Sequence, residues 1–136
     1  MKKSLIFILC ISLILLLLVF CDDNDEKTQS LEQFYKDANI ENVDKVIIQD
    51  GSTGYFKTIT NQEKIDEFLA LINEVQFTPQ ENQEKREGWR YGITLFNGEK
   101  EFKFILNHID NTYYDSNPEI YSAVDSYYKQ LDVVEE

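Results

Sequence analysis

The sequence predicts an α+β fold, in which an antiparallel sheet of five or six strands carries two main helices on one face. Two observations point to it: apolar residues recur at helical spacing in two segments, and they alternate along two segments that flank an Asn-Gly turn. A third observation, an apolar amino-terminal run, predicts a signal or anchor segment ahead of this fold. We therefore expect a single α+β domain over residues 31–136, because that length supports one compact core.

The domain is expected to begin with a short helix that Ser30 caps, with Gln33 reaching back three residues later. Its apolar face has helical spacing and consists of Leu31, Phe34, Tyr35 and Ala38. Two strands are expected next, at 44–50 and 54–60. The sequence DGST joins them, and one of its flanking glycines can supply the positive φ of a tight turn.

Two longer helices are expected at about 61–74 and 118–131. Thr60 and Glu63 form a capping box for the first. Asn117 is expected to cap the second, with Pro118 in its first turn. The two apolar stripes are Ile65, Phe68, Leu69 and Ile72 in the first helix, and Ile120, Val124, Tyr127 or Tyr128, and Leu131 in the second.

Asn97-Gly98 is the strongest hairpin signal in the chain, because type I′ turns favour this dipeptide. Shorter strands are expected at 75–79 and 112–115. In the strand before the Asn-Gly turn, 89–96, alternation groups Trp89, Tyr91, Ile93 and Leu95 on one side. The strand after the turn, 101–107, alternates Phe102, Phe104 and Leu106. The other face of the sheet is expected to meet water and to carry Arg90, Gly92, Thr94, Lys103 and Ile105.

Residues 1–20 have the form of an export signal, with Lys2 and Lys3 ahead of an apolar run from Leu5 to Phe20. A helix of these 16 residues covers about 24 Å, which is short of a bilayer core of about 30 Å. The sequence LVFC at its end resembles a bacterial lipobox, and this resemblance implies that Cys21 carries a lipid. Phe20 departs from the small residue usual before the cysteine, so an uncleaved anchor remains the alternative. Both outcomes put the domain at the cell membrane, on the extracytoplasmic side.

Residues 21–30 are read as a flexible acidic tether. All 25 acidic residues follow Cys21, whereas two of the 13 basic residues precede it, which leaves a formal net charge of −14 after the leader. A surface of this charge disfavours nucleic acid and anionic lipid headgroups, and it steers basic partners toward itself. The two cysteines, Cys10 and Cys21, both lie in or next to the leader, so the domain has no disulfide or cysteine-based zinc site.

No catalytic signature stands out, so we expect a protein that is not an enzyme. His108 is the only histidine, and the neighbouring Asp110 supplies no activated nucleophile. His108, Asp110 and Asp115 match no zinc or EF-hand spacing, so no metal and no cofactor are expected.

Aromatic residues near the carboxyl end are the candidates for an interaction surface. Tyrosine is enriched at interfaces, and it also packs at the rims of cores. Tyr113 and Tyr114 are interpreted either as part of a glycan- or protein-binding patch or as packing for the last helix. With His108 and Trp89, these two tyrosines form the candidate surface.

The layout is similar to small lipoproteins of unknown function from low-GC Gram-positive bacteria. The segments that carry the resemblance are LVFC, DGSTG between two strands, the amphipathic helix after them, and GWRYGITLFNGEKEFKF. The resemblance implies location and fold, and no activity.

Two functions follow as expectations. In the first, the chain is a membrane-tethered extracytoplasmic lipoprotein that binds an unknown protein or envelope component without catalysis. In the alternative, it is an acidic immunity or inhibitor protein that neutralises a basic toxin, peptide or wall hydrolase. Acidic charge clustered on one sheet face around an exposed aromatic would favour the alternative, and spread-out charge would favour the first.

Overall fold

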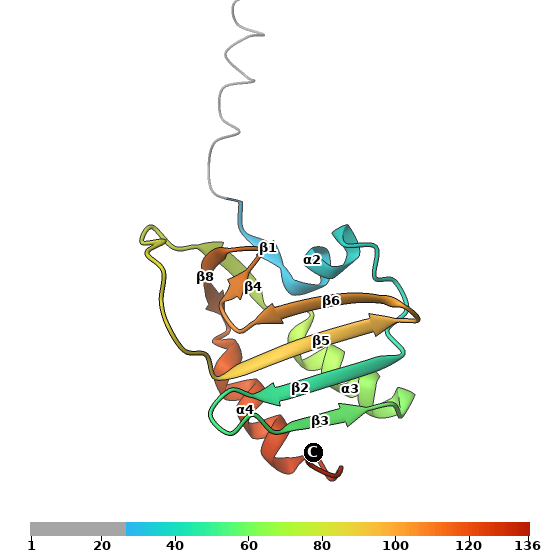
Figure 1. Ribbon diagram of the computed structural model, residues 1–136. Helices are drawn as coiled ribbons and strands as arrows, with labels where there is room; N and C mark the ends of the chain where they lie inside the picture. The colour runs from blue at the N-terminus through green and yellow to red at the C-terminus, as the bar shows by residue number, and fades with distance from the viewer. Residues whose placement is uncertain (1–26) are drawn as a thin grey trace, which may run out of the picture.

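The computed structural model describes residues 27–136, which form one eight-stranded sheet and three helices (Figure 1). The expected α+β class is confirmed, but the sheet has more strands than the five or six expected. The strands are β1 (Gln29–Ser30), β2 (Lys45–Asp50), β3 (Phe56–Ile59), β4 (Gln76–Pro79), β5 (Tyr91–Asn97), β6 (Lys100–Ile105), β7 (His108–Ile109) and β8 (Thr112–Asn117). The helices are α2 (Leu31–Asp37), α3 (Gln62–Ile72) and α4 (Ile120–Gln130).

The strands lie in the order β1-β4-β8-β7-β6-β5-β2-β3, and each neighbouring pair is antiparallel. The two missed strands, β1 and β7, have two residues each, which is too short for an alternating pattern to show. β1 includes Gln29 and Ser30, the last residues of the predicted tether. The predicted signal segment 1–20 and Cys21 lie outside the described residues.

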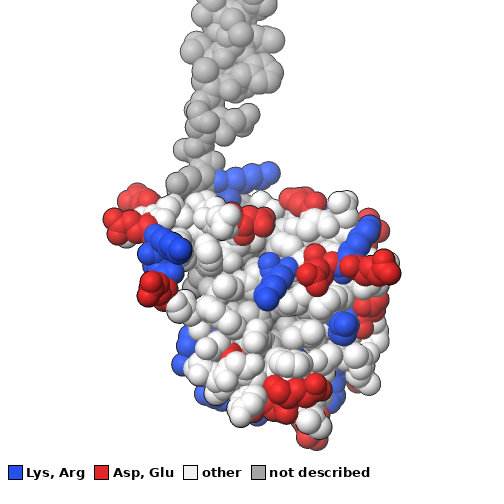
Figure 2. Space-filling view, viewed as in Figure 1, with Lys and Arg blue, Asp and Glu red and all other residues white. Residues whose placement is uncertain are grey.

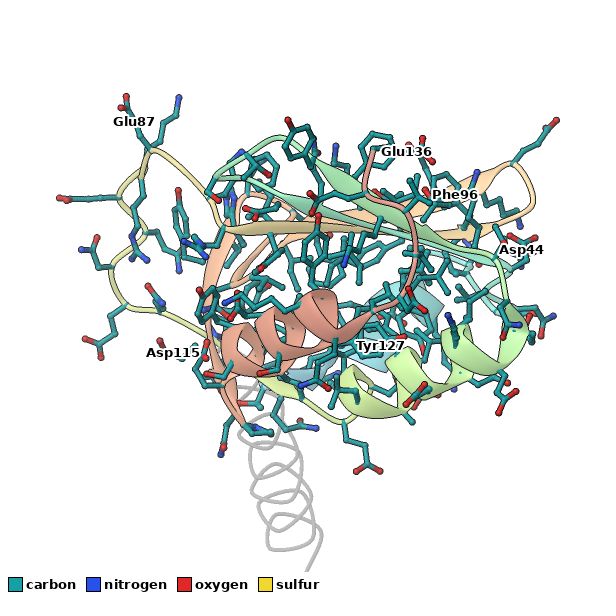
Figure 3. All side chains as sticks on the ribbon, turned by 90° about the horizontal axis from the view of Figure 1, so that it is seen from below. Asp44, Glu87, Phe96, Asp115, Tyr127 and Glu136 are labelled. Atoms are coloured by element: carbon teal, nitrogen blue, oxygen red, sulfur yellow. The ribbon has the colours of Figure 1, made fainter. Side chains whose placement is uncertain are left out.

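Helices α3 and α4 cover one face of the sheet, as predicted, and the core lies between the two layers (Figure 3). The strands supply Val46, Ile48, Ile93, Leu95 and Phe104, and the helices supply Phe68, Ile72, Ile120 and Val124. Tyr127 of α4 connects this helix to α3. Its ring packs against Phe68 of α3, and its hydroxyl donates a hydrogen bond to the Lys64 carbonyl of α3 at 3.2 Å. Burial of this set of apolar side chains is the main force that holds the layers together.

The helix caps differ from the sequence pattern in two of three cases. Ser30 caps α2 as expected and accepts a hydrogen bond from the Gln33 amide at 3.2 Å. Asn61, and not Thr60, caps α3. Glu119, and not Asn117, caps α4, and its carboxylate accepts bonds from the first-turn amides. Asparagine and glutamate side chains serve these helix ends as well as the expected residues, because both offer an acceptor oxygen to the unpaired amides.

The carboxyl end of the chain covers the outer edge of β3. The amide of Phe56 donates to the Glu136 carbonyl at 3.0 Å, and the Glu136 amide donates back at 2.9 Å. Lys57 pairs with Glu135 in an antiparallel bridge and donates from Nζ to the carbonyls of Tyr128 and Leu131 at the end of α4. A cation at a helix carboxyl end is stabilised by the helix dipole.

The face of the sheet opposite the helices carries both apolar and polar side chains. Ile47, Phe56 and Lys103 border a depression of about 250 Å³ around Thr94, which is only 9% exposed. In Figure 2 acidic and basic side chains are interspersed over this face, with uncharged surface between them. Gly92, Thr94 and Lys103 lie on this face, as expected.

Candidate ligand-binding cleft

The long loop between β4 and β5, residues 80–90, is fixed to strand β8. The side chain of Gln83 pairs with the backbone of Tyr113, because its oxygen accepts from the Tyr113 amide at 2.8 Å and its nitrogen donates to the Tyr113 carbonyl at 2.9 Å. The Gln80 amide donates to the same carbonyl at 2.9 Å. The pairing of β4 with β8 ends at Pro79 and Tyr114, and beyond that point the side-chain amide of Gln83 pairs with the backbone of β8 in place of a strand.

Tyr113 lies between a cation and an imidazole. The His108 ring is stacked on Tyr113 with centroids 4.2 Å apart, and the Arg86 guanidinium lies 4.4 Å from the Tyr113 centroid. Two planar groups this close occupy opposite faces of the ring. Arg86 is further held by hydrogen bonds from its guanidinium to the Gln80 side chain at 2.5 Å and to the Asn82 carbonyl at 3.1 Å.

Trp89 lies on the sheet face that the helices leave uncovered, and not with the core residues. A Cβ atom placed on Gly51 would lie 2.6 Å from the indole, and one placed on Gly92 would lie 3.4 Å from it. The indole therefore rests on two glycines, and its side chain remains 39% exposed. The expected grouping of Trp89 with Tyr91 is wrong.

Arg90 is also on the other side from the one expected. Its guanidinium lies 3.9 Å from Asp125 and 5.4 Å from the Tyr121 ring centroid, both on α4. The strand alternation begins only at Tyr91, and Gly88 has a φ of +79° just before Trp89. Residues 89 and 90 therefore belong to a turn and do not follow the alternation of β5. As a result, Trp89 lies on the uncovered face of the sheet and Arg90 on the side of the helices, the reverse of what a continuous strand would give.

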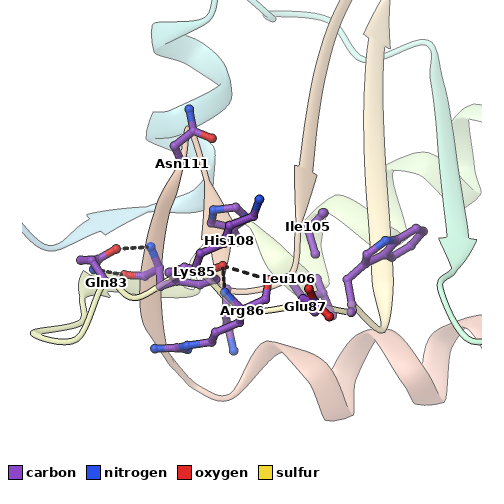
Figure 4. Close-up of a pocket in the computed structure, with 12 residues that line it drawn as sticks. Gln83, Lys85, Arg86, Glu87, Ile105, Leu106, His108 and Asn111 are labelled. Carbon is purple, nitrogen blue, oxygen red and sulfur yellow. Dashed lines mark hydrogen bonds between the residues drawn. The ribbon is translucent and has the colours of Figure 1, made fainter.

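A cleft of about 740 Å³ lies between the loop and the sheet, and we call it the loop cleft (Figure 4). The loop contributes residues 83 and 85–89, and the strands and turns around β7 contribute 105–108, 111 and 113. Ile105 and Leu106 supply an apolar floor, and Asn107 and Asn111 supply side-chain amides. The Oδ1 atom of Asn107 is buried and has no hydrogen-bond partner within residues 27–136.

The charge of the loop cleft is opposite to that of the whole domain. Lys85 and Arg86 line it with a single acid, Glu87. In an acidic chain this local excess of basic groups attracts an anionic ligand to the cleft.

The side chains of the loop cleft differ from those of a metal site. In the part of the chain that the structure describes, no group of three or more His, Cys, Asp or Glu side chains could hold a metal ion. The His108 ring is stacked on Tyr113, where it serves as part of the cleft wall. The cleft offers aromatic faces, amides and cations, which suits binding.

Three of the four predicted surface residues line the loop cleft: Trp89, His108 and Tyr113. Tyr114 does not, because its ring packs edge-on against Phe34 and Phe77 under α2. Sequence reasoning missed Lys85, Arg86, Asn107 and Asn111, which come from a charged loop and two turns without a recognisable motif. The predicted lipidation residue, Cys21, lies outside the described residues.

Within residues 27–136, none of the helices is long and apolar enough to cross a membrane. Comparisons of the chain with protein-family models, with curated proteins and with solved structures find no match. The fold and the loop cleft thus define a class, an α+β domain with a lined surface cleft, and the function has to be argued from the residues.

Proposed function

We propose that this chain is a membrane-tethered extracytoplasmic binding protein without enzymatic activity, and that the loop cleft holds its ligand, an envelope component. The observation that carries the proposal is the meeting of Trp89, His108 and Tyr113 in one cleft. Trp89 comes from the loop before β5, whereas His108 and Tyr113 are paired across β7 and β8, and the three side chains combine aromatic surface with polar groups. Such a mixture fixes the orientation of a bound ligand.

The hydrogen bonds of the loop support a binding role. A site that is already ordered before the ligand arrives loses less conformational entropy on binding. Gln83 and Arg86 hold the loop on Tyr113 through side-chain and backbone bonds, so the cleft does not depend on the ligand to take shape.

The tether is proposed from the leader and from Cys21. We expect cells grown with radiolabelled palmitate to label the wild-type protein, and Cys21→Ser to abolish the label. Cys10→Ser is the matched control, because Cys10 lies inside the apolar run, and it should keep the label. Equal labelling of the Cys21→Ser and wild-type proteins would contradict lipidation at this residue.

The alternative, an acidic inhibitor of a basic protein, has less support. Acidic and basic side chains are interspersed around the open sheet face (Figure 2). The exposed aromatic, Trp89, lines a cleft with Lys85 and Arg86 and not an acidic cluster. A basic partner would be repelled at this point.

The binding role is tested with the full-length protein in detergent micelles, immobilised and exposed to solubilised cell-envelope material. We expect wild type to retain an envelope component and Trp89→Ala to lose most of it, since an exposed aromatic anchor carries much of the energy of such contacts. Leu71→Ala is the matched control, because Leu71 is 43% exposed on α3, outside the residues that line the cleft. The proposal fails if Trp89→Ala and wild type retain the same material, or if neither retains any.

A further inference from the structure

We infer that the ligand of the loop cleft is an acidic saccharide, with a sugar ring on the indole of Trp89 and its anionic group held by Lys85 and Arg86. This inference rests on the proposed function and names the chemical class of the ligand. It is carried by three features of the cleft, which are its charge, its aromatic face and the pairing of its backbone.

The charge of the cleft selects an anion. Neither Lys85 nor Arg86 forms an ion pair with a carboxylate within residues 27–136. Arg86 is a fixed cation, because Tyr113, Gln80 and Asn82 all hold its guanidinium. A guanidinium has five N–H donors, so Arg86 retains donors for a ligand after these contacts. Lys85 is exposed, and its flexible side chain can form an ion pair with the same anion.

The aromatic face and the amides select a sugar. The Trp89 indole rests on Gly51 and Gly92 and Trp89 is partly exposed in the loop cleft, so it offers apolar aromatic surface to a ligand. Asn107 and Asn111 line the same cleft with side-chain amides. The Asn111 amide can both donate and accept hydrogen bonds, as a sugar hydroxyl does, so it matches a ligand rich in hydroxyl groups. The Oδ1 atom of Asn107 is buried and is not available to accept a hydrogen bond from a ligand.

The backbone around the cleft disfavours an extended peptide. Peptides that bind along a sheet add a strand to a free edge and pair with unpaired backbone groups. Here the Tyr113 amide is bonded to Gln83, the Leu106 amide to the Tyr91 carbonyl, and the Tyr114 amide to the Asn107 carbonyl. Recognition is therefore left to side chains, which suits a saccharide.

Trp89 gives a direct readout, because it is the only tryptophan in the chain. The full-length protein in detergent micelles is titrated with galacturonate trimer while tryptophan emission is recorded. We expect a saturable change in emission, and at least about tenfold weaker binding of the neutral galactose trimer, since a charge-assisted hydrogen bond is lost. Glucose 6-phosphate, in a parallel titration, shows whether a phosphate replaces the carboxylate, and saturable binding of either acidic sugar supports the inference.

Lys85→Ala is expected to weaken binding of galacturonate trimer at least about tenfold. Lys100→Ala is the matched control, since Lys100 is exposed at the far end of β6, and it should bind as wild type does. Both residues are on the surface, so thermal unfolding of both variants should match wild type.

The inference is overturned if no acidic sugar changes the emission, if the neutral trimer binds as tightly, or if a poly-glutamate peptide binds more tightly than galacturonate. It is also overturned if Lys85→Ala binds as wild type does. Retention of envelope material that depends on Trp89 would stand in each of these cases. These outcomes therefore distinguish an error in the class of ligand from an error in the proposed binding function.

Discussion

Gly51 determines where the indole of Trp89 can lie. The Gly51 amide donates to the Arg90 carbonyl at 2.6 Å, so the turn after β2 is bonded directly to the chain beside the tryptophan. A Cβ atom at Gly51 would press on the indole and on the Trp89 backbone. Trp89 can therefore pack against the sheet only because Gly51 has no side chain beyond a hydrogen atom.

We expect Gly51→Ala to destabilise the domain by about 1–3 kcal/mol, because the added methyl group overpacks a contact that includes backbone. Tryptophan emission should shift to longer wavelength as the indole moves into solvent. Both effects are measured on one sample, by denaturant unfolding followed through fluorescence.

Gly54→Ala is the control for this substitution. Gly54 has a φ of +81° and nothing within 4 Å of an added Cβ, so the cost is backbone strain of about 1 kcal/mol. Its emission should not change. An unshifted emission in Gly51→Ala would show that Gly51 does not hold the indole.

Three of the four residues that the sequence proposed for an interaction surface lie in one cleft, but the sequence did not predict where every side chain points. Trp89, His108 and Tyr113 were identified by residue type alone, and they line the cleft. Tyr114 has the same type, but it packs on Phe34 and Phe77, and no local pattern distinguishes it from its neighbour. The sides of Trp89 and Arg90 were missed because a turn before β5 breaks the alternation.

At the scale of elements, Asp125 joins helix α4 to strand β5. Its carboxylate accepts hydrogen bonds from Lys129 at 2.8 Å and from the Tyr91 hydroxyl at 2.7 Å. The bond from Lys129, and then the bond from Tyr91, lower the pKa of Asp125 below its usual value of 3.8. The same contact raises the pKa of Tyr91, whose burial has the larger effect.

A carboxylate with a lowered pKa in the folded state stabilises the fold above its unfolded pKa. That stability is lost as the pH falls through the folded pKa. We expect Asp125→Asn to be less stable than wild type at neutral pH, and the difference to close between about pH 4 and pH 2. Urea unfolding across this range measures it, and Glu101→Gln controls for the loss of one exposed negative charge. A difference that stays constant down to pH 2 would contradict the assignment.

The edge of β3 is a second feature at this scale. Residues Val133–Glu136 cover it through the paired bonds between Phe56 and Glu136. We expect removal of residues 133–136 to expose β3 and to give dimers that increase with protein concentration, because free strand edges pair with each other. Light scattering after size-exclusion chromatography measures the mass. Glu135→Gln keeps the backbone bonds and should match the wild type in mass, while a monomeric truncated protein would contradict the role of the tail.

The long elements were predictable because each has its own period. β2, β3, β5 and β6 alternate, α3 and α4 repeat at helical spacing, and all were expected close to their observed bounds. β1, β7 and the choice of capping residue were not predictable, because two residues carry no period and several polar side chains serve as caps equally well. The loop cleft was not predictable as a unit, since it depends on how the 80–90 loop lies against β8.

At the scale of the whole molecule, the chain is acidic, whereas the loop cleft has two basic side chains and one acidic one. A net negative charge disfavours anionic headgroups, and Lys85 and Arg86 lie where the proposed anionic ligand would bind. β1 begins at Gln29 at one edge of the sheet, on the opposite side of the strand order from β3. In the strand order, β4 separates β1 from β8, which lines the loop cleft.

We propose that the leader carries this domain across the cell membrane and keeps it attached on the outer side. Cell fractionation, followed by protease treatment of intact protoplasts, tests it most directly. We expect the full-length protein in the membrane fraction, and its domain to be digested by external protease while a cytoplasmic marker stays intact. Recovery of the protein in the cytosolic fraction, protected from protease, would contradict the account.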